Sequence, residues 1–283
     1  MSLIAEMLAG GVAGAAGVLS TQPLDTIRIR LQSSVSNLGM ATGYNGIVHC
    51  AVATFRNEGL RGLYKGVVSP TATVGAMNAV LFLSYECASD AARKQSGIGR
   101  NKDLPLRQVF ACGAVAGFTT AFITAPTELV KCLAQTDLRS KGCASDELRI
   151  MRRLVQEHGW LGRRGLARGL LMTIARETPS FGLYFSVYEL ICRRCGRARL
   201  VQFYAGGFAG ALAWASIYPV DVVKTWWQTA APGTYRFVGH CLKVGFAAEG
   251  YGMFCKGFGA TMARAWPQNA VIFFTYELVK DLL

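Results

Sequence analysis

Long apolar segments that carry no charged residue alternate with polar segments along the chain. No Asp, Glu, Lys or Arg occurs between Glu6 and Asp25, Lys65 and Glu86, Arg107 and Glu128, or Arg199 and Asp221. Each window approaches the roughly 20 residues that a bilayer-spanning helix requires. Segments 169–188 and 257–276 are equally apolar except for charges partway along. The pattern predicts six transmembrane helices; the alternative is a large soluble protein with buried core helices.

A four-residue motif recurs three times, each time near the end of an apolar segment. It consists of a proline, an acid two residues later, a base three residues further and a glutamine four residues after the base. The copies are Pro23, Asp25, Arg28 and Gln32; Pro126, Glu128, Lys131 and Gln135; and Pro219, Asp221, Lys224 and Gln228. Offsets of 103 and 93 residues separate them, which is typical of an internally repeated fold.

The residues around each motif repeat as well. The GxxxG pairs that precede the prolines are Gly10 and Gly14, Gly113 and Gly117, and Gly206 and Gly210. Such pairs let membrane helices approach closely. After a polar stretch come "EGLRGLYKG" (58–66), the degenerate "EHGWLGRRGLARG" (157–169) and "EGYGMFCKG" (249–257). A second apolar segment then ends in Tyr-Glu, so each repeat is predicted to be a helix, a short amphipathic surface helix and a helix.

The three copies together resemble the mitochondrial carrier family, whose signature is Pro-x-acid-x-x-base, a short helix, acid-Gly and aromatic-basic-Gly. The resemblance covers the whole chain. It implies an all-α membrane protein with six transmembrane helices in three pseudosymmetric repeats, residues 1–100, 101–197 and 198–283, which form one bundle. Each repeat would carry a short matrix-side amphipathic helix. The implied location is the mitochondrial inner membrane, crossed several times, with both termini facing the intermembrane space.

The charged motif residues are expected to form a ring. Prolines bend helices, so three bent helices would converge at their motif ends, and charges inside a membrane bundle are tolerated when they pair. The predicted pairs are Asp25 with Lys131, Glu128 with Lys224, and Asp221 with Arg28. The resemblance implies that this ring is the matrix gate and that Gln32, Gln135 and Gln228 brace it. A static clasp is the alternative, although buried ion pairs are weak evidence for stability.

A second gate is expected at the opposite, cytoplasmic end, where the family pattern is aromatic-acid-x-x-base. The third repeat matches it with Tyr276, Glu277 and Lys280. The first repeat has Tyr85 and Glu86 but Ser89 in place of the base, and the second has Tyr188 and Glu189 but Cys192, with Arg193 one place late. We therefore expect a weak outer gate and a resting preference for the outward-open state.

Candidate substrate residues are found at equal depths in the second helix of each repeat. Eight residues after the basic residues Lys65, Arg168 and Lys256 stand Thr73, Arg176 and Arg264. Eight helical residues rise about 12 Å, which is well inside a bundle. One turn deeper are Met77, Ser180 and Gln268, with Glu177 beside Arg176 and with Asn78 and Asn269 just beyond. Equivalent registers face one axis, so these residues are expected to surround a central site.

The predicted site chemistry suits a zwitterion. Arginine binds carboxylates in bidentate fashion, and Glu177 can hold an ammonium group. The segments "RETPSFGLYF" and "RAWPQNAVIF" are similar to those of carnitine/acylcarnitine and amino-acid carriers, and they depart from nucleotide carriers. Ornithine-type carriers have an acid near Met77 or Asn78, so its absence argues against a strictly dibasic substrate. Alternatively, Arg176–Glu177 is a structural pair; Trp214, Trp226 and Trp227 are interpreted as packing aromatics.

Composition narrows the functional class. The chain has 283 residues, 52% hydrophobic and 17% charged, with a net charge of +13 and a mean hydropathy of +0.28. An excess of basic residues is typical of proteins that bind nucleic acid or an anionic membrane. The high apolar content favours the membrane, so we expect no nucleic acid as a partner. No nucleophile–base set, P-loop or Rossmann motif appears, so we expect no enzyme and no cofactor. The "CRRC" at 192–195 lacks a second pair, so we expect no metal site.

We therefore predict a monomeric secondary transporter that exchanges a small zwitterion, of amino-acid or carnitine/acylcarnitine type, by alternating access. A carrier-like protein without exchange (an adaptor or leak) and a carrier for keto acids or nucleotides are the alternatives. Cardiolipin is an expected lipid partner. Its phosphates suit basic residues beside helix N-termini, here "YKG" (64–66), "ARG" (167–169) and "CKG" (255–257). Ordinary interfacial basic residues would explain the same segments.

Overall fold

The computed structural model describes residues 3–33, 44, 46–99, 102–137, 144–159, 165, 168–230, 234–255 and 257–282. Six long helices are α1 (Leu3–Ser33), α3 (Val68–Ser96), α4 (Leu106–Thr136), α6 (Leu170–Cys195), α7 (Arg199–Thr229) and α9 (Phe258–Leu282). Three shorter helices are α2 (Ile47–Leu63), α5 (Ala144–His158) and α8 (Val238–Glu249), and a 3₁₀ helix, η1 (Gly250–Cys255), follows α8. The order long, short, long thus occurs three times in the described ranges, as the repeats predict.

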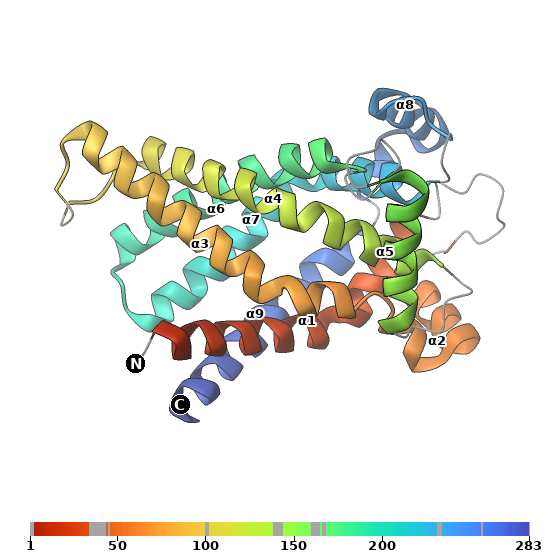
Figure 1. Ribbon diagram of the computed structural model, residues 1–283, viewed down its shortest axis with the longest axis horizontal. Helices are drawn as coiled ribbons and strands as arrows, with labels where there is room; N and C mark the ends of the chain where they lie inside the picture. Colours follow the sequence, from red (N-terminus) through yellow and green to blue (C-terminus); the bar gives the residue numbers. More distant parts are fainter. Residues whose placement is uncertain are drawn as a thin grey trace.

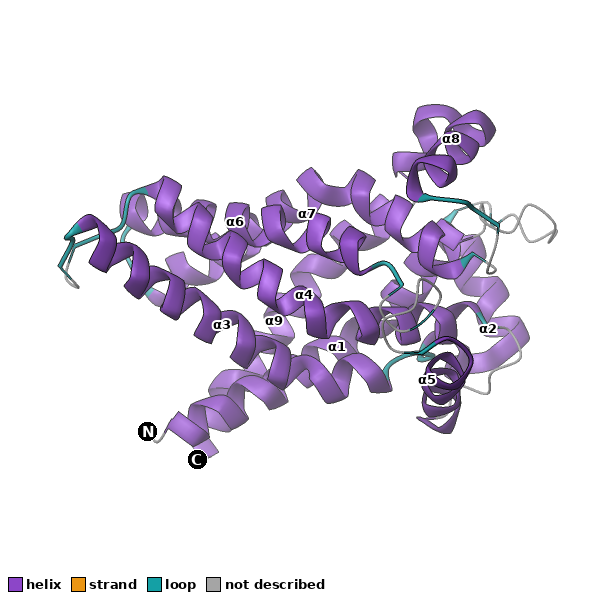
Figure 2. Cartoon of the chain, turned by 45° about the horizontal axis from the view of Figure 1, so that its top comes forward, coloured by secondary structure: helices purple, strands orange, loops and turns teal. Residues whose placement is uncertain are grey.

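The long helices form one bundle, and the short helices lie together at one end of it (Figure 1). Each long helix contacts its neighbours in the closed order α1, α3, α4, α6, α7, α9. Both chain termini lie at the end opposite to α2, α5 and α8 (Figures 1 and 2). We call the end with the short helices the inner end and the opposite end the outer end.

The long helices contain 25 to 31 residues, enough to cross the roughly 30 Å hydrocarbon core at about 1.5 Å per residue. By length and apolar composition alone, Leu106–Thr136 and Leu200–Thr229 qualify as spans, and Ile47–Leu63 with Val68–Ser96, bent by 52°, would add a third. The remaining long helices are α1, α6 and α9. Their place in the bundle follows from the repeat and not from hydropathy.

Two glycine positions in each repeat set the turns at the inner end. The glycine of the acid-Gly signature has φ of 66°, 71° and 59° at Gly59, Gly159 and Gly250. The glycine of the basic-Gly signature has φ of 74°, 87° and 76° at Gly66, Gly169 and Gly257. These left-handed conformations are unfavourable for residues with a Cβ atom. Gly59 therefore kinks α2, whereas Gly159 and Gly250 directly follow the ends of α5 and α8. The glycine of the basic-Gly signature precedes the next long helix in all three repeats.

The predicted GxxxG contacts differ in closeness. A Cβ atom at Gly113 would lie 2.6 Å from the carbonyl oxygen of Phe181, and one at Gly117 would lie 2.4 Å from that of Glu177. The α4 and α6 backbones therefore touch directly. In the first repeat Gly14 packs on Val74, whereas a Cβ at Gly10 would meet nothing within 4 Å. The small-residue interface is thus tightest in the second repeat.

Candidate functional site

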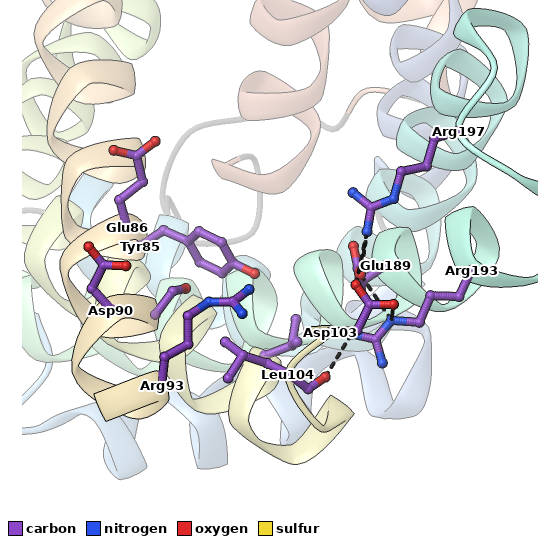
Figure 3. A pocket seen from close by; sticks show the side chains of 11 residues that line it. Tyr85, Glu86, Asp90, Arg93, Asp103, Leu104, Glu189, Arg193 and Arg197 are labelled. Atoms are coloured by element: carbon purple, nitrogen blue, oxygen red, sulfur yellow. Dashed lines mark hydrogen bonds and ion pairs between the residues drawn. The ribbon is translucent and has the colours of Figure 1, made fainter. Parts of the chain in front are cut away.

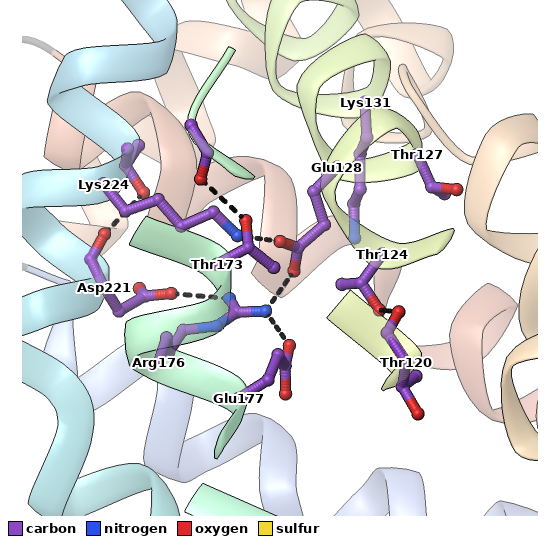
Figure 4. A network of polar contacts seen from close by, with 12 residues as sticks. Thr120, Thr124, Thr127, Glu128, Lys131, Thr173, Arg176, Glu177, Asp221 and Lys224 are labelled. Carbon is purple, nitrogen blue, oxygen red and sulfur yellow. Dashed lines mark hydrogen bonds and ion pairs between the residues drawn. The ribbon is translucent and has the colours of Figure 1, made fainter. Parts of the chain in front are cut away.

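Three ion pairs, one of them buried and two partly buried, join the motif helices α1, α4 and α7 in a ring. The Nζ atom of Lys131 bonds Asp25, the Nζ atom of Lys224 bonds Glu128, and the guanidinium of Arg28 bonds Asp221. Figure 4 shows the part of this network around Glu128, Lys224 and Asp221. These are the pairs that the threefold motif predicts.

The motif spacing explains the ring. An acid and a base three residues apart lie on the same helix face, and Arg28 NH1 is 3.7 Å from Asp25 Oδ1 within α1. Each helix can therefore use its acid toward one neighbour and its base toward the other. The side chains of Asp25, Arg28 and Asp221 are 3–5% exposed, so the pairing compensates charges that are removed from solvent.

The motif glutamines are buried, but only one of them touches an ion pair. Gln32 Nε2 donates to the Tyr218 hydroxyl at 3.0 Å and lies 3.5 Å from Asp221 Oδ2. Gln135 Nε2 donates to Thr26 Oγ1 at 3.2 Å, and Gln228 Nε2 donates to a backbone carbonyl at 3.3 Å. The expectation of a glutamine brace under each pair is therefore met for Gln32 alone. The other two glutamines tie the motif helices to adjacent hydroxyl and backbone groups instead.

Arg176 and Arg264 lie directly against the ring. Arg176 NH1 is 2.9 Å from Asp221 Oδ1 and its NH2 is 2.8 Å from Glu128 Oε1; NH2 also bonds Glu177 (Figure 4). Arg264 NH1 is 3.1 Å from Asp25 Oδ1. A cavity of about 100 Å³ at the centre of the ring is lined by both arginines and the six charged motif residues. The two arginines that were predicted at equal helix depths thus bind carboxylates that also belong to the ring.

Trp214 on α7 also lines this cavity. Its ring lies 4.9 Å from the guanidinium carbon of Arg28 and 5.5 Å from those of Arg176 and Arg264, all within cation–π distance. From the sequence, Trp214 is interpreted as a packing or interface aromatic, and its contacts in the structure include these guanidinium groups. The available signal was its position seven residues before Asp221, which places both side chains on one helix face.

The other predicted substrate residues do not line the central cavity. Asn78 and Gln268 lie beside α1: Nδ2 of Asn78 is 3.6 Å from a Cβ position at Gly14, and Cγ of Gln268 is 3.5 Å from one at Gly17. Equal depth does not fix helix rotation, and the small residues of α1 draw these side chains toward them. Their role in substrate binding stays a prediction.

Three further positions were predicted at the same depths. The Thr73 hydroxyl donates to the carbonyl of Ser69 at 2.9 Å and lies 3.7 Å from the sulfur of Met77. Ser180 is half-buried on α6. These contacts stay within the same helix and join none of the three residues to the ring. The Asn269 side chain lies outside the described residues.

At the outer end, Glu189 finds its bases close in the sequence. Its Oε1 atom accepts from Arg193 Nε at 2.9 Å and from Arg197 NH2 at 2.8 Å. Asp103, from the α3–α4 connection, lies 3.4 Å from Arg197 (Figure 3). Arg193, four residues after Glu189, therefore pairs with it along α6 and not with a different long helix.

Aromatic rings accompany these charges. Tyr85 of α3 stacks on Phe185 of α6 with ring centroids 4.1 Å apart, and Tyr188 stacks on Tyr184. A cavity of about 450 Å³ at the outer end is lined by Tyr85, Glu86, Ser89 and Glu189 among others (Figure 3). The outer end is therefore hollow where the inner end is closed by ion pairs. The side chains of Tyr276, Glu277 and Lys280 lie outside the described residues.

Below the ring, at the inner end, Glu58 of α2 binds two bases. Arg30 donates to both of its carboxylate oxygens at 2.5 and 2.9 Å, and Lys65 Nζ is 2.5 Å from Oε2. Burial alone would raise the pKa of Glu58, but the hydrogen bonds from Arg30 and Lys65 hold it below 4.5. We call Arg30, Glu58 and Lys65 the inner clasp.

The first two expected cardiolipin positions use their basic groups within the protein. Lys65 is 1% exposed and also donates to the carbonyl of Asp137 at 2.9 Å. The backbone amides at the start of α3, Val68 and Ser69, donate to the carboxylate of Glu147 at 3.0 and 2.7 Å. Arg168 donates to the carbonyl of Ala230 at 2.9 Å. A protein carboxylate thus takes the anion position at the α3 N-terminus; Lys256 lies outside the described residues.

This architecture defines a class: a membrane solute carrier, with a threefold repeated helical bundle closed at one end by ion pairs and hollow at the other. A family model described as mitochondrial carrier protein matches residues 1–96, 102–199 and 197–283. The chain belongs to the mitochondrial carrier family.

Curated relatives cover almost the whole chain. It is 34% identical to a mitochondrial carnitine/acylcarnitine carrier-like protein of Arabidopsis thaliana, over 98% of both chains. It is 37% identical to a mitochondrial basic amino acids transporter of Homo sapiens, over 97% of this chain and 89% of the relative. It is 34% identical to a mitochondrial carnitine/acylcarnitine carrier protein of Mus musculus, over 98% and 94%. These relatives are named as carriers and transporters, and the chain is a multi-pass transport protein of the mitochondrial inner membrane.

Proposed function

We propose that this carrier exchanges a small zwitterion across the membrane by alternating access. The observation that carries the proposal is that Arg176 and Arg264 line the cavity of about 100 Å³ at the centre of the ion-pair ring, with Glu177 bonded to Arg176. An anionic group of the substrate would bind the guanidinium groups bidentately. A cationic group would bind Glu177 and the face of Trp214, which already attracts guanidinium groups.

The names of the relatives support carnitine, acylcarnitines and amino acids as candidates. Neutral Thr73, Met77 and Asn78 on α3 supply no second acid, which favours a substrate with one cationic group over a dibasic one. An α-amino-acid with a neutral side chain and a carnitine ester both meet this condition. A dibasic amino acid meets this condition less well. Glu177 would bind its first cationic group, and Thr73, Met77 and Asn78 supply no acid for the second.

The two ends are proposed to act as gates. Opening the inner end would require the ring pairs to separate, and a near-balanced buried ion pair suits a contact that must break and reform. The outer gate would use Glu86, Glu189 and Glu277. One chain supplies all three repeats and a complete ring, which supports a monomeric transport unit. A static clasp in a protein without exchange is the competing function.

The test is uptake into proteoliposomes that are preloaded with candidate counter-substrates: carnitine, acylcarnitines, basic and neutral amino acids, keto acids and nucleotides. Arg264→Ala is compared with Arg153→Ala, a surface residue on α5 whose side chain is 75% exposed. We expect exchange of a zwitterion that is lost in Arg264→Ala and kept in Arg153→Ala. Exchange of keto acids or nucleotides only would contradict the zwitterion proposal. Folded protein that exchanges nothing would support the static clasp.

A further inference from the structure

We call the contact between two neighbouring motif helices a seam. The three seams α1–α4, α4–α7 and α7–α1 are closed differently on the inner side of the ring. The position two residues after each motif base points to this difference: it is Arg30 on α1, Leu133 on α4 and Trp226 on α7. Arg30 belongs to the inner clasp and also donates from Nε to the carbonyl of Gln135 at 3.1 Å. It therefore ties α1 to α4 with charged hydrogen bonds.

The α7–α1 seam is closed by the indole of Trp226. Its Nε1 atom donates to the carbonyl of Gln32 at 2.6 Å, and the side chain is fully buried. Gln32 in turn donates to Tyr218 on α7 at 3.0 Å. The seam thus has two hydrogen bonds below the ring pair of Arg28 and Asp221.

The α4–α7 seam has Leu133 at the corresponding position, which offers no polar group. Its charged contacts in the described residues are the Lys224–Glu128 pair and a bridge that comes from α6. Arg176 reaches Glu128 of α4 with one terminal nitrogen at 2.8 Å and Asp221 of α7 with the other at 2.9 Å. Figure 4 shows the guanidinium between the two carboxylates. Arg176 therefore spans this seam at the level of the ring, while Arg168 donates to the carbonyl of Ala230 at the inner end of α7.

Both terminal nitrogens of Arg176 are engaged with carboxylates of the protein, NH1 with Asp221 and NH2 with Glu128 and Glu177. A bidentate carboxylate binds a guanidinium through two adjacent nitrogens, at least one of which is terminal. A substrate carboxylate that binds across NH1 and NH2 therefore competes with Asp221 and Glu128 for the same donors. Arg264 differs, because its described ion pair is with Asp25 alone.

We infer that Arg176 holds the inner gate closed by joining Glu128 of α4 to Asp221 of α7, and we call this role the pin. A substrate carboxylate opens the α4–α7 seam by displacing these two carboxylates from Arg176. The inference rests on the proposed function for its substrate step. The pin itself does not, because the bridge exists without substrate. Lysine at this position would keep one charge near the site, but one ammonium group does not reproduce the planar fork that holds two carboxylates from two helices.

The experiment measures distances between spin labels at exposed positions on the three short helices. Arg56→Cys on α2, Arg152→Cys on α5 and Lys243→Cys on α8 are exposed and are combined in pairs in a cysteine-free background that retains exchange. Arg176→Lys is compared with Arg264→Lys. Without substrate, we expect Arg176→Lys to broaden and lengthen the α5–α8 distance while the α2–α5 distance stays unchanged. Arg264→Lys should leave the α5–α8 distance as it is.

L-carnitine and L-arginine are then added to the labelled protein with native Arg176. The compound that the protein exchanges should shift the α5–α8 distance in the same direction as Arg176→Lys does. Adding this compound to the Arg176→Lys variant should not shift the distance further. An α5–α8 distance that is unaltered by Arg176→Lys, or altered equally by Arg264→Lys, would overturn the pin. A displaced seam in a protein that exchanges no zwitterion of the uptake panel would keep the pin and reject the proposed function.

Discussion

Trp226 and Gly245 form a contact that leaves no room for a side chain. The indole is fully buried, and a Cβ atom at Gly245 would lie 1.8 Å from its ring. Helix α8 can therefore cross Trp226 only at a glycine. The same indole bonds the carbonyl of Gln32 on α1, so a single residue pair holds α8, α7 and α1 together at the inner end.

Gly245→Ala is expected to destabilise the carrier by about 1–3 kcal/mol, because the methyl group would force the indole or α8 to move. The measurement is the thermal unfolding midpoint of the purified protein in mild detergent. Gly252→Ala is the matched control, since a Cβ there meets nothing within 4 Å. Equal midpoints for the two variants would show that α8 yields without cost.

At the scale of elements, the inner clasp joins α2 to the ends of α1 and α4. Glu58 is 12% exposed and Arg30 is 3% exposed, so solvent screens their ion pair little. The short helix is thereby fixed to two motif helices in the first repeat. In the second repeat the acid Glu157 is 51% exposed and pairs with Arg153 on the same helix.

Glu58→Gln is expected to lower stability by about 3 kcal/mol at neutral pH, because Arg30 and Lys65 would lose a buried counter-charge. Glu157→Gln, at an exposed pair, should cost less than about 1 kcal/mol. Unfolding by chaotrope at neutral pH measures both. A Glu58→Gln effect as small as that of Glu157→Gln would show that the clasp contributes no stability.

The effect of Glu58 also has a defined pH dependence. Its pKa in the folded protein lies below the ordinary value of 4.5, so the unfolded chain binds this proton at a higher pH than the folded chain does. The stabilisation is complete above about pH 4.5 and is lost as the pH falls through the lower folded value. The difference between the native protein and Glu58→Gln should therefore shrink below pH 4.5. A difference that grows in acid would contradict this assignment.

At the scale of the whole molecule, the two ends of the bundle are not equivalent. The inner end has a ring of three ion pairs between different helices. At the outer end, Glu189 pairs with Arg193 along its own helix and with Arg197 just after it. Arg193 and Arg197 also pair with Asp103 of the α3–α4 connection, at 3.7 and 3.4 Å. The preference for an outward-open state stays a prediction.

A base at position 89 should shift that balance. Ser89 and Glu189 line the same outer cavity from α3 and α6, so Ser89→Lys would add a pair between two long helices, worth up to about 1 kcal/mol, or roughly fivefold in the conformational equilibrium. Binding of an inhibitor specific for the outward-open state should weaken by that factor. Ser89→Met, of similar length without charge, should not weaken it. Unchanged binding in Ser89→Lys would count against a weak outer gate.

The threefold motif by itself determined much of this protein. Three ion pairs, six long helices and three short ones follow from residue types repeated at one spacing, because helix periodicity places the acid and base of each motif on one face. The recurring glycines likewise follow from the sequence, since each marks a backbone turn that residues with a Cβ atom avoid. Such features depend on local geometry that the sequence repeats three times. Membership of the family places the resulting bundle in the membrane.

Tertiary structure alone decided what lies around the ring. Depth along a helix is readable from residue counting, but helix rotation depends on how closely neighbouring helices pack, which is why Asn78 and Gln268 face α1 while Arg176 faces the ring. The choice among several possible partners is likewise set by the assembled bundle. Three contacts between residues far apart in the chain illustrate this. Glu147 of α5 accepts from the start of α3, Trp214 lies among three guanidinium groups, and Arg176 of α6 bridges α4 and α7.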